Sequence, residues 1–63
     1  MNTNVRSMWI ANIENVIEEL VKGGMSDCVK FTIQRHGCTN LSDVPDFDLP
    51  ELFDELSYME SEL

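Results

Sequence analysis

Three side chains in the middle of the sequence could bind a metal ion or perform thiol chemistry: Cys28, His36 and Cys38. A structural zinc site needs four ligands, and its cysteines commonly come in closely spaced pairs. Here the two cysteines are ten positions apart, and Asp27 or Asp43 would have to complete the site. We therefore expect no metal site and no cofactor. Cys28 fits a small core residue, and His36 fits a cap for helix carbonyls.

The same residues give little support for an enzyme. If one helix holds both Cys28 and His36, they lie about 12 Å apart along its axis, beyond hydrogen-bond reach. His36 and Cys38 flank Gly37 with no third residue evident to orient them. Carboxylates are abundant, but a chain of 63 residues offers little cleft in which to shield one from water. The sequence predicts a protein that is not an enzyme.

The elements that position these residues begin with a helix predicted over residues 4–22, where apolar side chains recur at helical spacing. Thr3 or Asn4 can cap its first amides. Gly23-Gly24 ends it, because glycine adopts the left-handed C-cap conformation without steric cost. Its wide apolar stripe would be a large patch for a small monomer to expose. We therefore predict a self-association surface, made of Trp9, Ile13, Ile17 and Leu20.

A second helix is predicted over residues 49–62, where apolar residues again recur every three or four positions. Pro50 falls in the first turn, where its missing amide hydrogen costs nothing. Asp48 and Glu51 have the spacing of a capping box, with aspartate in place of the usual serine or threonine. Both ends of the chain are thus expected to be helical.

The segment between these helices is ambiguous. Val29, Phe31 and Ile33 alternate with polar residues, as in a strand. Its ends are punctuated as in a helix, with Ser26 at the N-cap position and Gly37 after the last turn. We predict a helix over residues 27–36, and hence an all-α fold of three helices. The alternative is an α+β fold with residues 28–35 as a strand paired across a dimer, since a lone strand is unstable.

The charge of the chain is distributed unevenly. Residues 1–35 are neutral overall, whereas residues 36–63 contain eight acidic residues and no lysine or arginine, which accounts for the net charge of −8. Such a block repels nucleic acid and anionic lipid and attracts basic surfaces. The helix ending at His36-Gly37, followed by LSDV and an acid-capped helix, resembles small helical DNA-binding modules in outline. Its charge is the reverse of theirs, so we expect no direct binding to nucleic acid or membrane.

The acidic C-terminal segment, residues 43–63, is the main candidate site, within a single domain of residues 1–63. It mixes acids with aromatic and aliphatic side chains, as recognition helices do. A basic partner protein would relieve the repulsion among its carboxylates. The residues predicted to bind this partner are Asp43, Asp46, Asp48, Glu51, Asp54, Glu55, Tyr58 and Glu62.

Two functions follow as expectations. The first is a small acidic protein–protein interaction module, an inhibitor or modulator that docks on a basic, nucleic-acid-binding surface. The alternative is a structural homo-oligomer, such as a homodimer, or an assembly subunit whose acidic face serves only solubility. The first 21 residues lack a basic n-region and contain three glutamates, so they do not resemble a secretory signal and we expect a cytoplasmic protein. Small acidic proteins of this class are often encoded by phages and mobile elements.

Overall fold

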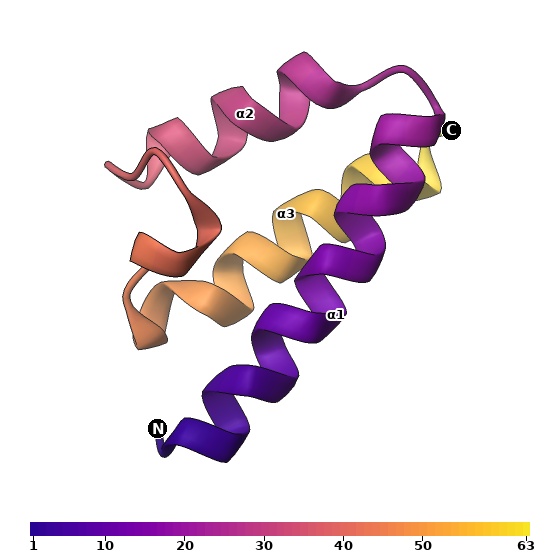
Figure 1. Cartoon of the computed structure of the whole chain (residues 1–63). Helices are drawn as coiled ribbons and strands as arrows, with labels where there is room; N and C mark the ends of the chain where they lie inside the picture. Colours follow the sequence, from indigo (N-terminus) through magenta and orange to yellow (C-terminus); the bar gives the residue numbers. More distant parts are fainter.

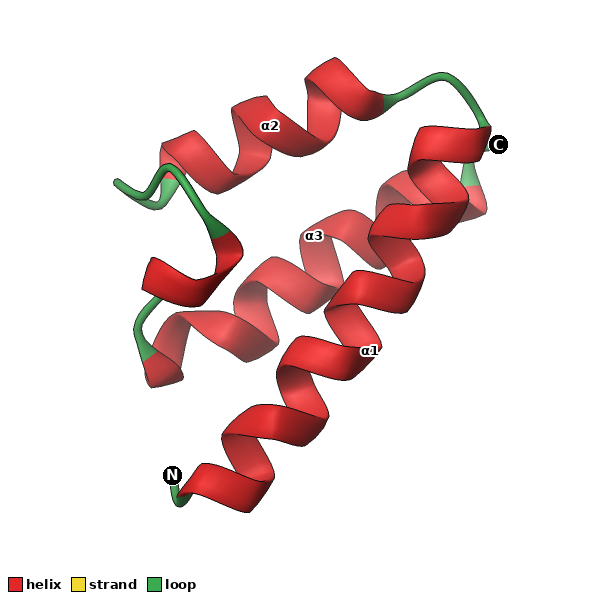
Figure 2. Ribbon diagram, viewed as in Figure 1, coloured by secondary structure: helices red, strands yellow, loops and turns green.

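Three helices and no strand make up the computed structural model, which describes residues 1–63 (Figures 1 and 2). The all-α prediction is confirmed, and the helices begin and end within a residue or so of the predicted positions. Two short 3₁₀ turns, η1 and η2, connect the second helix to the third. The elements are α1 (Thr3–Lys22), α2 (Ser26–Arg35), η1 (Leu41–Asp43), η2 (Asp46–Asp48) and α3 (Leu49–Ser61).

The alternative prediction of a strand over residues 28–35 is wrong, because this segment is α2. Helical geometry places Val29, Thr32 and Ile33 on one buried face, whereas Phe31 is 64% exposed. The Thr32 hydroxyl donates to the Cys28 carbonyl, one helical turn earlier, at 2.8 Å. Packing against α1 and α3 therefore outweighed the alternating pattern that favoured a strand.

The core is apolar and draws on all three helices and on the connection between η1 and η2. It contains Val44, which is fully buried just before Pro45. Trp9 of α1 packs edge-on against Phe53 of α3, with ring centroids 5.7 Å apart and planes at 69°, an arrangement typical of aromatic pairs. The buried core side chains are Ile13, Val16, Leu20, Val29, Ile33, Val44, Leu49, Leu52 and Leu56.

The ends of α1 differ from the prediction at one residue. Asn2, rather than Thr3 or Asn4, is the N-cap, and its Oδ1 accepts a hydrogen bond from the Val5 amide at 2.8 Å. At the other end the predicted glycine stop is present, with Gly24 at a φ of +83°. The Met25 amide then donates to the Leu20 carbonyl, which closes the last turn.

Replacing Gly24 with alanine is expected to lower the free energy of unfolding by about 1–2 kcal/mol, because a Cβ is disfavoured at positive φ. No atom would lie within 4 Å of that Cβ, so the effect comes from the backbone alone. Gly23→Ala is the matched control: its Cβ would meet the flexible side chain of Leu63 at 2.8 Å, and the Glu19 carbonyl oxygen at an ordinary contact distance of 3.5 Å. Urea denaturation of both variants checks this, and equal losses would contradict it.

Candidate acidic docking surface

A row of exposed polar side chains runs along the side of α3 opposite to its buried leucines. Glu51, Asp54, Tyr58 and Glu62 are all exposed, at intervals of three or four residues, and we call them the α3 stripe. With a rise of about 1.5 Å per residue, the stripe is about 16 Å long. None of its three carboxylates forms an ion pair within the chain. The stripe is therefore open to a cationic partner.

Two further exposed residues precede α3 in the chain. Asp43, at the end of η1, is exposed and has no ion-pair partner. Phe47 in η2 is 80% exposed, which makes it the most exposed large apolar side chain of the protein. Phe47 is not among the predicted binding residues, although its position between Asp46 and Asp48 is a signal visible in the sequence.

Asp46 is already paired within the chain. Its Oδ1 lies 2.6 Å from Nη1 of Arg6, and Nη2 of Arg6 donates to the Ser42 carbonyl at 3.0 Å. A cation from the neutral half of the sequence thus lies against the acidic half. The charge that is fully segregated in the sequence is less segregated in space, and Asp46 is not free to bind a partner in this structure.

His36 lies between two other predicted binding residues. Its Nε2 lies 3.0 Å from Oε1 of Glu55, and its Nδ1 lies 3.6 Å from Oδ2 of Asp48. The tautomer with hydrogen on Nε2 donates to Glu55. The His36 side chain is only 10% exposed. Asp48 and Glu55 therefore hold α2 against α3 instead of facing a partner.

This arrangement corrects two capping predictions. Asp48 has helical backbone angles and makes no side-chain cap hydrogen bond, so it forms no capping box with Glu51. The ring of His36 pairs with α3 rather than with the carbonyls that end α2. Both errors involve the same ring, because His36 lies 3.0 Å from Glu55, 19 positions away in the sequence, and 3.6 Å from Asp48, and neither contact is local to a helix end.

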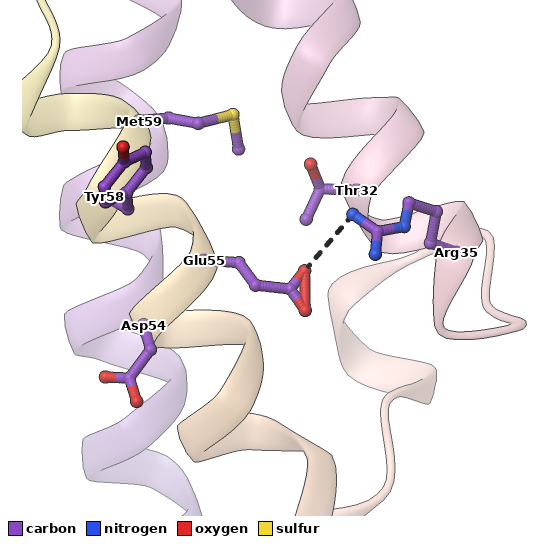
Figure 3. Close-up of a pocket in the computed structure, with 6 residues that line it drawn as sticks. All are labelled: Thr32, Arg35, Asp54, Glu55, Tyr58 and Met59. Atoms are coloured by element: carbon purple, nitrogen blue, oxygen red, sulfur yellow. Dashed lines mark ion pairs between the residues drawn. The ribbon is translucent and has the colours of Figure 1, made fainter.

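A shallow groove of about 480 Å³ lies between α2 and α3 (Figure 3). Arg35 contributes its only cation, and Nη1 of Arg35 lies 3.9 Å from Oε2 of Glu55. That oxygen is buried and accepts no hydrogen bond. The groove is continuous with the stripe, since Asp54 and Tyr58 belong to both. Its lining residues are Thr32, Arg35, Asp54, Glu55, Tyr58 and Met59.

The three residues considered for metal or thiol chemistry do not form a cluster. Cys28 is exposed on α2, so its assignment to the core is wrong. Cys38 is half-buried, and its Sγ lies 3.5 Å from the His36 carbonyl oxygen and 3.4 Å from that of Asp43. No three Cys, His, Asp or Glu side chains are placed to hold a metal ion.

The predicted self-association surface is only partly accessible. Ile13 and Leu20 are 0% exposed and pack in the core of the single chain, so a dimer that keeps this fold cannot use them. Trp9 and Ile17 are half-buried and pack against the same core. The apolar face of α1 that was predicted to form a dimer interface packs instead against α2 and α3 within one chain.

No helix of the chain is long and apolar enough to cross a membrane. The chain matches no family model, no curated protein and no solved structure. The geometry of the site is therefore the basis for a functional proposal.

Proposed function

We propose that this chain is a protein–protein interaction module that docks the α3 stripe and Asp43 on a basic surface of a partner protein. The observation that supports it most directly is the presence of four carboxylates, those of Asp43, Glu51, Asp54 and Glu62, that form no ion pair within the chain. Their mutual repulsion is relieved when lysines or arginines of a partner approach.

The kind of basic surface follows from the shape of the stripe. A single helix face about 16 Å long presents its carboxylates in a row, and a groove that binds nucleic-acid phosphates presents cations in a row. Phosphates recur every ~3.4 Å along one strand, so the match is coarse. Tyr58 adds an exposed ring, at 69%, on which an arginine side chain can stack. The proposed action is inhibition or modulation, in which the module covers a nucleic-acid-binding surface.

The test compares three immobilised proteins as baits for a nuclease-treated lysate, eluted with increasing salt. They are the natural chain, the stripe variant E51Q/D54N/E62Q, and the control E14Q/E18Q/E19Q, which removes the same charge from exposed positions of α1. We expect the natural chain and the control to retain the same basic proteins and to release them as salt rises, because exposed ion pairs are screened by salt. The stripe variant should not retain these proteins, because it lacks the three carboxylates of the stripe.

A purified protein from that eluate then supplies the quantitative measurement. The dissociation constant of its complex with the stripe variant should be more than about tenfold higher than with the natural chain, since close interfacial charge pairs contribute more than 1 kcal/mol each. With the control, this constant should stay within about twofold of that for the natural chain. A nucleic acid bound by the same protein should compete. Equal affinities for the stripe variant and the natural chain would refute the proposal.

A further inference from the structure

A second apolar row lies on α1, on the flank of the helix beside its core-facing stripe. Val5 and Met8, followed by the polar Asn12, lie at intervals of three and four residues, the spacing of a coiled-coil seam, and Met1 precedes the helix. Val5 is 39% exposed and Met8 is 65% exposed. The next positions of the seam are Asn15 and Glu19, so its apolar part is limited to the first half of α1.

A hollow lies within this seam. It has a volume of about 230 Å³ and is lined by Val5, Met8, Trp9 and Asn12. Trp9 is fixed in place by its contact with Phe53, so one wall of the hollow is rigid. The surface thus carries a projecting, flexible methionine beside an apolar hollow that such a side chain can fill.

The first turns of α1 extend past the other elements of the chain. In Figure 1 the N-terminal end of this helix (indigo) lies beyond α2 and α3, and Arg6 reaches from it to Asp46 and Ser42 in the connection between them. Residues 1–5 are exposed accordingly, and so are Ser7 and Met8. The chain itself therefore leaves this half of the seam uncovered.

We propose that the seam is the contact between two copies of this chain, with the two α1 helices antiparallel and crossing near Met8. Under two-fold symmetry the same patch must complement itself. The seam does so, because Met8 of each copy can fill the hollow of the other. A chain of this size also has a marginal core, which association in pairs would supplement.

The distribution of charge favours a second copy of this chain as the partner and an antiparallel arrangement of the two α1 helices. Residues 1–13 contain no aspartate or glutamate, although the chain carries a net charge of −8. Two copies repel each other least when they meet through this segment. A parallel pair would place the two Glu19 side chains, which occupy a seam position, beside each other. An antiparallel pair that crosses near Met8 places them at opposite ends of the contact.

Sedimentation equilibrium of the purified chain over a range of concentrations tests this proposal. We expect the natural chain to form dimers whose dissociation constant does not increase with salt, since the contact is apolar. Met8→Glu should raise that constant more than about tenfold, because two carboxylates would meet across the axis. Phe47→Glu, the same type of change at the more exposed Phe47, should leave it unchanged. A natural chain that stays monomeric, or a Met8→Glu variant that pairs like the natural chain, overturns the proposal.

Disulfide trapping tests which face of α1 contacts the other copy. In a background with Cys28→Ser and Cys38→Ser, Met8→Cys should cross-link two chains rapidly under mild oxidation, because the two positions face each other across the axis. Ser7→Cys, one residue away on another face of α1, should not. Equal trapping at both positions would show that the seam is not the contact between the two copies. These measurements use the purified chain alone, so their outcome is independent of whether the α3 stripe binds a basic protein.

Discussion

Replacing Leu56 with alanine is expected to lower the free energy of unfolding by about 2–5 kcal/mol. Leu56 is 0% exposed and belongs to the core cluster to which all three helices contribute. Its removal leaves a cavity that the surrounding side chains fill only in part. A core of this size supplies no more than about 3–5 kcal/mol in total. The variant should therefore be largely unfolded at 25 °C.

The measurement is urea denaturation followed by far-ultraviolet circular dichroism. Val21→Ala is the control, because Val21 is on α1 but 49% exposed; its loss should stay below about 1 kcal/mol. If Leu56→Ala were as stable as this control, Leu56 would not be a central core residue. Self-association adds to apparent stability by mass action, so both variants are compared at equal chain concentration.

Replacing His36 with alanine is expected to lower the free energy of unfolding by about 1.5–3 kcal/mol, the range for hydrogen bonds to charged groups. The change leaves the carboxylates of Asp48 and Glu55 without the ring that lies between them at 3.6 and 3.0 Å. The side chains of both acids are mostly buried, with 21% and 26% exposed. Arg35, 3.9 Å from Glu55, remains and compensates in part.

A double-mutant cycle separates the His36–Glu55 contact from general effects of truncation. It uses His36→Ala, Glu55→Ala and the double variant, with Gln34→Ala as the control at an exposed position of α2. We expect a coupling energy of about 1 kcal/mol or more. Additive losses, or a loss for His36→Ala no larger than that for Gln34→Ala, would show that the pair does not hold α2 against α3.

Much of the fold could be predicted from the sequence because its signals are local. Apolar residues at helical spacing located α1 and α3, and Gly24 and Gly37 mark the chain just after α1 and α2 with positive φ angles. Residues 27–36 were harder, because Val29 and Ile33 satisfy both a strand and a helix pattern. The conformation of this segment depends on its packing against α1 and α3, which buries Val29 and Ile33 on one face of a helix.

The candidate site was predicted less well, since a list of acidic residues does not show which of them are already paired. Arg6 and Asp46 are 40 positions apart, and His36 and Glu55 are 19 apart. No local pattern indicates such pairs. Once Asp46, Glu55 and also Asp48, which lies 3.6 Å from His36, are removed from the predicted set, the α3 stripe and Asp43 remain as the accessible residues.

The helices at both ends of the chain and the sign and position of its charge follow from the order of the amino acids alone, because helix periodicity and composition need no distant contacts. Which carboxylates are free and which face of α1 is covered depend on the folded arrangement, because an ion pair or a buried side chain needs a neighbour from a distant part of the chain. Ile13 and Leu20 are covered by the other helices, whereas the neighbouring row with Val5 and Met8 is left exposed on the same helix.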